Sequence, residues 1–262
     1  MNLLNQISTV SIIGSGNVAS VLGKAITDAD IKILDVFSPN ISNSKLLAEK
    51  LDCNYVDSIE KLNTVSDLYI LATPDNEIVN SITNLPTITG IVVHTSGTEP
   101  CEILAGKFEN YGVFYPLQTF TKNRQVDFKD VPICIEGSND KTSDLLVKMA
   151  RKISNNVVLL NSEKREYLHL TAVTVNNFTN LLYSIAHDVL EEKGIDFALL
   201  HPLIKETALK IQDVNPHLAQ TGPARRNDIT TVNKHLQLLE KHPEFREIYD
   251  LLSKQIIIKH HG

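Results

Sequence analysis

The sequence predicts an α/β domain built on a doubly wound, mainly parallel sheet, followed by an all-α domain. From residue 7 to about 160, short apolar runs rich in β-branched residues alternate with helical patterns, an order typical of parallel strands joined by crossover helices. After about residue 161, only long helical patterns follow, broken at glycine and proline. We therefore predict a first domain over residues 1–160 and a second over residues 161–262.

Seven strands are expected in the first domain. They are the apolar runs at residues 7–13, 31–37, 67–73, 90–96, 111–116, 131–136 and 156–160. Four long helices are expected in the second domain, at about residues 162–193, 196–213, 229–240 and 243–258. Because no stretch rich in glycine or serine separates the two halves, we expect the domains to pack together with a cleft between them.

Composition excludes several classes of protein. At 262 residues and 42% hydrophobic content the chain can bury a sizeable core. A net charge of -6 without a long basic run argues against nucleic acid as a partner. No leader is evident, and no apolar run approaches the roughly 18 residues that span a bilayer, so we expect no membrane partner. Cys53, Cys101 and Cys134 are far apart, which predicts neither a disulfide framework nor a metal site and fits the cytoplasm.

The turn after the first strand contains Gly14, Gly16 and Ala19 in the spacing GxGxxA, a form of the dinucleotide-binding fingerprint. A strand precedes this turn, a helical pattern follows it, and a second strand comes next, as the fingerprint requires. Gly14 permits a tight turn, Gly16 lets the backbone approach a pyrophosphate, and the helix N-terminus supplies N–H donors. The residues predicted to bind the pyrophosphate are Gly14, Ser15, Gly16, Asn17 and Val18. A glycine turn without a ligand is the alternative.

The end of the second strand indicates which nucleotide binds. NAD-binding proteins usually place an acidic residue there for the ribose 2′-hydroxyl, whereas NADP requires its absence. Here the strand runs into Ser38, and the nearby acid, Asp35, is expected within the strand, before the ribose position. Ser38 and Asn40 can hydrogen-bond a 2′-phosphate, and Lys45 can add charge. We therefore expect NADP as the cofactor in preference to NAD.

Two further strand ends are expected at the same edge of the sheet. Ligands of open α/β sheets bind at the carboxyl ends of the strands, so we expect these residues to surround the nicotinamide. They are Ala72, Thr73 and Pro74 after one strand, and His94 and Ser96 after the next. The alternatives are local roles, because Asp75 can cap a helix and the hydroxyls of Thr95 and Ser96 can serve a turn.

The first long helix carries polar residues at helical spacing. His169, Asn176, Asn180, Tyr183 and His187 are separated by 7, 4, 3 and 4 positions, which predicts one shared face. Buried polar groups without partners cost about 1–3 kcal/mol each, so these should meet a ligand, a helix or water. We predict that His169 and Asn176 hold or protonate a substrate oxygen or nitrogen, because imidazole exchanges protons near neutrality. A structural network is the alternative, and we prefer it for Tyr183 and His187.

The segment "QTGPARRND" interrupts the helical domain. Gly222 and Pro223 break the helix, and Asp228 is expected to cap the next one. Arg225 can bind a carboxylate or phosphate, with ordinary surface charge as the alternative. The candidate substrate contacts are Gln118, Asn177 and Arg225.

Five motifs together resemble a known family: "IIGSGNVA", "HTSG", "YGVFYPLQTF", "LHLTAVTVNNFTNLLY" and "QTGPARRND". The chain resembles the Rossmann-like proteins with a helical C-terminal domain of unknown function. That group is related to pyrroline-5-carboxylate reductase, deazaflavin-dependent NADP reductase and the 6-phosphogluconate dehydrogenase-like superfamily. The resemblance covers essentially the whole chain. It implies an NAD(P)-binding Rossmann domain, a helical C-terminal domain like that of 6-phosphogluconate dehydrogenase that mediates homodimerisation, and an active site between them.

The chain departs from the hydroxyacid dehydrogenases of that superfamily at one position. Those enzymes place a lysine four residues before an asparagine, whereas Ala172 and Val173 stand four residues before Asn176 and Asn177 here. Either His169 takes over proton transfer, or the chemistry resembles imine reduction. We expect an NADP-dependent oxidoreductase acting on a small imine, ketone or hydroxyacid. A non-catalytic NADP-binding sensor or scaffold protein is the alternative.

Overall fold

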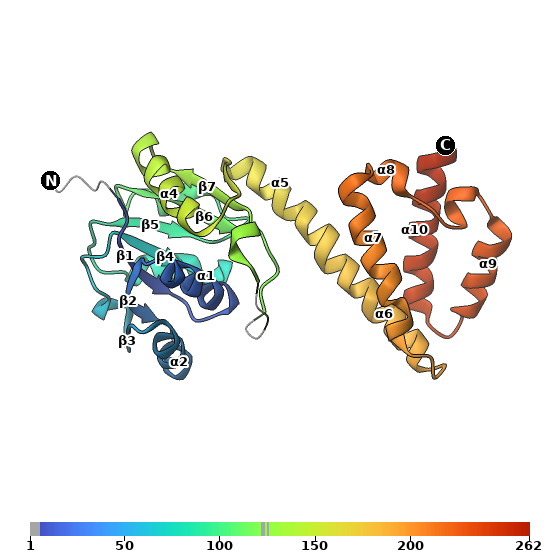
Figure 1. Cartoon of the computed structure of the whole chain (residues 1–262), viewed down its shortest axis with the longest axis horizontal. Coiled ribbons are helices and arrows are strands. Elements are labelled where there is room, and N and C mark those ends of the chain that lie inside the picture. The colour runs from blue at the N-terminus through green and yellow to red at the C-terminus, as the bar shows by residue number, and fades with distance from the viewer. Residues whose placement is uncertain (1–5, 122–123, 125) are drawn as a thin grey trace. The chain divides into compact units, whose positions relative to one another are not determined.

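A computed structural model describes residues 6–121, 124 and 126–262 (Figure 1). The chain divides into two compact units, residues 1–177 and 178–262. The first contains an eight-stranded sheet, and the second contains only helices within its fully described span. The expected domain boundary after residue 160 lies next to the last strand and stays a prediction.

The sheet of the first unit is parallel except where β6 and β7 pair antiparallel. Its strands are β1 (Thr9–Ile13), β2 (Lys32–Phe37), β3 (Asn54–Val56), β4 (Leu68–Leu71), β5 (Ile91–His94), β6 (Tyr111–Pro116), β7 (Ile133–Gly137) and β8 (Val157–Leu159). They are ordered β3-β2-β1-β4-β5-β6-β7-β8. The order reverses between β1 and β4, the point at which doubly wound sheets bind ligands. The predicted fold class is confirmed.

Strand β3 is the one described strand that the sequence does not predict. It has three residues and no continuous apolar run, because it lies at the edge of the sheet where Asn54 and Tyr55 are exposed. The other seven strands overlap the predicted runs. Those runs are apolar because the interior strands of a parallel sheet are covered on both faces.

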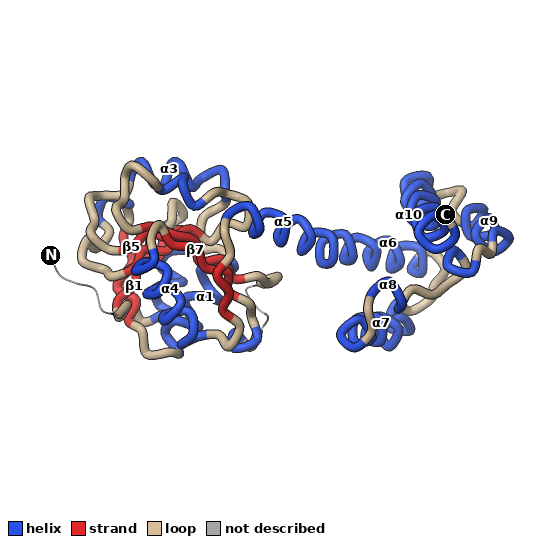
Figure 2. The backbone as a smooth tube through the Cα atoms, turned by 90° about the horizontal axis from the view of Figure 1, so that it is seen from above, coloured by secondary structure: helices blue, strands red, loops and turns tan. Residues whose placement is uncertain are grey.

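Helices cover both faces of the sheet (Figure 2). The helices of this unit are α1 (Asn17–Asp28), α2 (Ile41–Leu51), α3 (Ile78–Asn84), α4 (Asp140–Ile153) and α5 (Ser162–Val173). Buried side chains of α1, α2 and α4 form one core with the sheet, while α3 packs in a second core on the opposite face. The unit therefore buries apolar side chains on both sides of its strands, which fixes the carboxyl edge of the sheet in place.

The predicted helix over residues 162–193 contains an irregularity. A π-helical turn, Thr174–Phe178, separates α5 from α6 (Thr179–Glu191). A π turn inserts an extra residue into the helical repeat, and such turns are frequent at functional sites. The spacing that predicted one polar face from His169 through His187 therefore does not hold across residues 174–178. A single polar face along the whole predicted helix stays a prediction.

The helical unit, residues 178–262, contains four longer α-helices, one α-helix of four residues and short 3₁₀ turns. Besides α6 these are α7 (His201–Asp213), α8 (Pro216–Ala219), α9 (Ile229–Leu238) and α10 (Pro243–His261). Within residues 178–262, all of which are described, only Ala224, Val232 and Ser253 are buried. Across the described part of the chain, no helix combines the length and apolar character needed to cross a membrane.

Candidate functional site

A cavity of about 340 Å³ surrounds the glycine turn at the carboxyl ends of β1, β2 and β4. Its lining includes, among the predicted cofactor residues, Gly14, Ser15, Gly16, Ser38, Ala72, Thr73 and Pro74. The three strands are neighbours in the sheet and run parallel, so their ends meet at one edge. Long-range strand pairing thus brings together seven predicted residues from three separate segments.

The two glycines of the turn have different surroundings. Gly14 adopts a φ of +123°, and its N–H donates to the carbonyl of Phe37 at 2.7 Å. A Cβ at position 14 would overlap the carbonyl oxygen of Ala72, so only glycine fits there. A Cβ at Gly16 would meet no atom within 4 Å, and Gly16 stands directly before α1. The helix N-terminus therefore opens onto free space of the kind that a pyrophosphate needs.

The end of β2 offers neutral hydrogen-bonding groups. The Ser15 hydroxyl donates to the buried Ser38 hydroxyl at 2.8 Å, which leaves the Ser38 proton for another acceptor. The Asn40 side chain caps α2 by accepting from the N–H of Asn43 at 3.0 Å, so it is committed locally. Asp35 lies within β2, and its carboxylate accepts from the N–H of Asn63 at 2.7 Å. The residues that line this cavity at the end of β2 are Phe37, Ser38 and Pro39, and none of these three is acidic.

The same cavity has residues that the sequence reasoning missed. Glu77, Asn80, Ser81 and Asn84 line it from the segment that contains α3. Their spacing of three, one and three positions puts them on one helical face, a signal that was present in the sequence. The Thr73 hydroxyl oxygen is buried without a hydrogen-bond partner among the described residues. Together with the space beside Gly16, this unsatisfied group fits a site that receives a polar ligand.

His94 and Ser96 do not line this cavity. His94 is fully buried, its Nδ1 accepts from the N–H of Ser96 at 3.2 Å, and burial lowers its pKa from 6.5 to about 4. The Ser96 hydroxyl accepts from the N–H groups of Thr98 and Glu99 at 3.1 and 3.0 Å. Both side chains shape the turn after β5, the local role that the sequence left open for Ser96.

Asn17 and Val18 have structural contacts. The Asn17 amide donates to the carbonyl oxygen of Phe120 at 2.8 Å, and Val18 packs against the core of the sheet. Asn17 therefore connects the N-terminus of α1 to the loop after β6. That loop also carries Gln118.

A second cavity, of about 350 Å³, lies between the end of β6 and α5. Its lining includes Tyr115, Gln118, Thr119, His169, Asn176 and Asn177. The structure thus brings together His169 and Asn176, the predicted proton-handling pair, with Gln118 and Asn177, two predicted substrate contacts. Ala172 and Val173, which replace the superfamily lysine, also line it. The cavity offers an imidazole and several amides, which can orient a polar substrate and exchange a proton with it.

Arg165 anchors the helix that carries His169, a role that sequence reasoning missed. Its guanidinium is fully buried and donates to the Glu136 carboxylate at 2.6 Å and to the backbone carbonyl of Glu99. The Ser162 hydroxyl donates to the same Glu136 oxygen at 2.7 Å. Arg165 stands four positions, about one helical turn, before His169 and so shares its face of α5. That spacing is the feature of the sequence that could have identified Arg165.

The helical unit contains the remaining candidates. Asp228 caps α9 by accepting from the N–H of Thr231 at 3.0 Å, as expected. Arg225 is half-buried and lies in a short 3₁₀ turn, Ala224–Arg226. The unit has its own apolar cavity of about 550 Å³, lined mainly by leucine and isoleucine.

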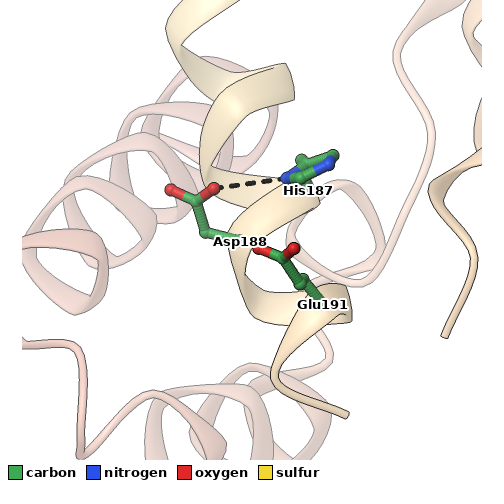
Figure 3. A group of neighbouring side chains, drawn as sticks. All are labelled: His187, Asp188 and Glu191. Carbon is green, nitrogen blue, oxygen red and sulfur yellow. Dashed lines mark hydrogen bonds and ion pairs between the residues drawn. The ribbon is translucent and has the colours of Figure 1, made fainter. Parts of the chain in front are cut away.

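Three side chains of α6 offer ligand atoms within 4.8 Å of one another: His187, Asp188 and Glu191 (Figure 3). His187 Nδ1 and Asp188 Oδ1 are 3.3 Å apart. All three are exposed and come from a single helical turn. Exposed acidic groups of this kind are common without an ion, so we assign no metal to them.

Comparison with known proteins supports the two-part organisation. Residues 2–117 match the model of a Rossmann-like domain, and residues 131–256 match a domain of unknown function, DUF2520. None of the curated proteins compared with the chain matches it. A solved structure from Bacteroides fragilis, named "putative NADP oxidoreductase", is similar at 36% identity with a TM-score of 0.89. That similarity covers 96% of this chain and 98% of that one.

Two more distant structures share the fold. A Thermotoga maritima protein has 21% identity and a TM-score of 0.81 over 97% of this chain and 100% of that one. A Streptococcus pyogenes 1-pyrroline-5-carboxylate reductase has 15% identity and a TM-score of 0.64 over 95% of this chain and 98% of that one. These matches confirm the resemblance drawn from the sequence motifs. The chain therefore belongs to the family in which a Rossmann-like domain is followed by the domain of unknown function DUF2520.

Proposed function

We propose that the protein is an NADP-dependent oxidoreductase that acts on a small polar substrate held beside His169 and Asn176. The observation that carries the proposal is the placement of two cavities at one edge of the sheet. The cavity around the glycine turn meets the ends of β1, β2 and β4, and the His169 cavity meets the end of β6, with β5 between them. A dinucleotide laid along this edge brings its reactive end toward His169.

The residues of the first cavity fit the cofactor. Gly14 forms the tight turn, and the open space beside Gly16 lets a pyrophosphate approach the N–H groups at the start of α1. The Ser38 hydroxyl and the N-terminus of α2 provide neutral donors for a 2′-phosphate, and β2 ends without an acidic residue to repel it. The Bacteroides fragilis relative, which carries the NADP name, supports the same assignment.

The residues of the second cavity bind and orient the substrate. When bound, NADP supplies or accepts a hydride, and the protein must manage the accompanying proton. His169 holds or exchanges a proton at the substrate oxygen or nitrogen, while Asn176, Asn177 and Gln118 orient that atom by hydrogen bonds. An imine, a ketone or a hydroxyacid fits this set, and the absence of a lysine at Ala172 favours a proton path through His169.

The helical unit mediates a homodimer. Exposed apolar side chains are frequent on it, among them Leu203 at 62% and Leu238 at 79% exposure, and it buries three residues of its own. A surface of this kind is stabilised when a second copy covers it. Charged substitutions at Leu182 and Leu252, which line its apolar cavity, should convert the dimer to a monomer in light scattering. The three cysteines are free, which fits a cytoplasmic protein.

The decisive experiment is a fluorescence titration of the purified protein with NADPH and, separately, with NADH. We expect NADPH to bind at least about tenfold more tightly, a difference of about 1.4 kcal/mol. Gly14→Ala should abolish binding, whereas Gly106→Ala, another glycine with positive φ but with open space beside it, should bind normally. No binding of either nucleotide would refute the proposal.

Turnover is tested next with His169→Ala. This variant should lose reduction of imines and ketones yet retain NADPH affinity, since His169 lies outside the first cavity. An unchanged rate would remove His169 from the chemistry. Tight NADPH binding by the native protein without reduction of any substrate class would instead favour the non-catalytic sensor.

A further inference from the structure

We propose that Tyr115 is a positioning residue for His169: it holds Nδ1 of the imidazole so that Nε2 carries the ring proton and serves the substrate cavity. This inference rests on the proposed function and deepens it. A fixed N–H donor in the cavity selects substrates whose reacting group has a lone pair, such as a carbonyl oxygen or a neutral imine nitrogen.

The contact joins two elements that are distant in the sequence. The Tyr115 hydroxyl and His169 Nδ1 are 2.9 Å apart, and the two rings meet edge to face with centroids 5.9 Å apart. Tyr115 comes from the buried end of β6, whereas His169 is half-buried on α5. Because the tyrosine ring is packed within the sheet unit, its hydroxyl is a fixed point beside the half-buried imidazole.

Gly97 provides the space that the imidazole occupies. A Cβ on Gly97 would overlap Nδ1 and Cγ of His169, so this edge of the ring packs directly on the turn after β5. The Ser96 hydroxyl fixes that turn through the N–H groups of Thr98 and Glu99. Arg165 anchors α5 one turn earlier. Tyr115 and the turn after β5 therefore contact the Nδ1 edge of the ring, and we assign Nε2 to the cavity that His169 lines.

The hydrogen bond between Tyr115 and His169 indicates which imidazole nitrogen carries the proton. Burial raises the pKa of Tyr115 to about 12, so its hydroxyl keeps its proton at neutral pH. Among the described residues, His169 Nδ1 is the one hydrogen-bond partner of that hydroxyl. Either group could donate in this contact, and we infer that Tyr115 donates, because its hydroxyl proton has no other acceptor among the described residues. A neutral imidazole that accepts at Nδ1 carries its proton at Nε2. The role resembles that of groups which fix a histidine tautomer through its second nitrogen.

The test is ¹⁵N NMR of the full-length protein labelled at histidine. Nine histidines are present, and His169→Gln identifies the His169 signals by their loss. We expect the neutral form of native His169 to carry its proton at Nε2. Tyr115→Phe should shift its signals toward a mixture of tautomers, whereas Tyr111→Phe, which removes a hydroxyl from the same strand, should leave them unchanged.

A second variant, Gly97→Ala, keeps the proposal testable if Tyr115→Phe fails to fold. Gly97→Ala should displace the ring and produce the same mixture without altering Tyr115. A native Nδ1–H form, or identical His169 signals in native protein and Tyr115→Phe, would overturn the proposal. Titration of the same samples with NADPH separates the two claims. If the native protein does not bind NADPH, the proposed oxidoreductase function is refuted. The tautomer measurement tests the role of Tyr115 independently of that result.

Discussion

The sheet unit and the helical unit solve the problem of burying apolar side chains in different ways. The sheet unit buries residues on both faces of its strands and even encloses a guanidinium, Arg165. The helical unit buries three residues in 85 positions, from 178 to 262. The difference indicates that the sheet unit is stabilised by its own core, and it leads us to expect that the helical unit requires contacts beyond itself.

The largest expected effect comes from breaking the buried ion pair of the sheet unit. Arg165→Met removes the cationic partner of Glu136 and leaves its mostly buried carboxylate with the Ser162 hydroxyl as its remaining donor, which should cost about 3 kcal/mol of the free energy of unfolding. Urea denaturation followed by circular dichroism measures it. Lys164→Met, at an exposed position of the same helix, should change stability by no more than about 0.5 kcal/mol. Equal losses in both variants would show that Arg165 does not anchor α5.

A matched pair of leucines compares the two cores directly. Leu146 is fully buried in the sheet unit, so Leu146→Ala should cost about 2–5 kcal/mol at every protein concentration. Leu252 is 43% exposed in the helical unit, so Leu252→Ala should act mainly through self-association, and its effect should grow on dilution. Thermal melts over a hundredfold range of concentration distinguish the two. Concentration-independent losses at both positions would remove the contrast between the units.

Acid should weaken the sheet unit through His94. Burial, with a contribution from Arg165, lowers the pKa of His94 to about 4, so the folded state keeps the ring neutral while the unfolded chain binds a proton below about pH 6.5. The stabilising contribution is complete above pH 6.5 and is lost as the pH falls toward 4, by up to about 1.4 kcal/mol per pH unit.

The variant His94→Asn isolates this effect. At pH 7 the stability difference from the native protein measures packing alone, and at pH 5 it should shrink because the variant has no ring to protonate. Urea denaturation at both pH values measures the change. A difference that is independent of pH would mean that the His94 imidazole titrates normally in the folded protein.

The smallest expected effect concerns the reactivity of the three cysteines, which reports on opening of the sheet unit. Burial raises the pKa of Cys53 and Cys101 to about 12 and raises that of Cys134, so all three remain protonated and unreactive at pH 8. An aromatic disulfide reagent should modify none quickly in native protein and all three in urea. Because the sequence places no cysteine after residue 134, the reaction follows opening of the sheet unit alone. Rapid modification of the native protein would contradict the burial of these three thiols in the sheet unit.

Local sequence determined the elements of this protein. Apolar runs and helical periodicity predicted seven of the eight strands and the long helices, and Gly14-Ser15-Gly16 predicted the turn before α1, because periodicity and glycine chemistry act over a few residues. The same reasoning named His169, Asn176 and Gln118 as candidate site residues, and the three line one cavity. It missed β3, which is too short and polar to have a pattern.

Tertiary structure decided which side chains of those elements meet. His94 ends β5 and Thr73 follows β4 at the same edge of the sheet, yet His94 is fully buried while Thr73 lines the first cavity. Tyr115 contacts His169, which is 54 positions later in the sequence, and the buried Arg165 of α5 pairs with Glu136 of strand β7. The π turn ends the helical spacing that local reasoning had extended. These outcomes follow from strand order and packing between distant segments, which no window of neighbouring residues contains.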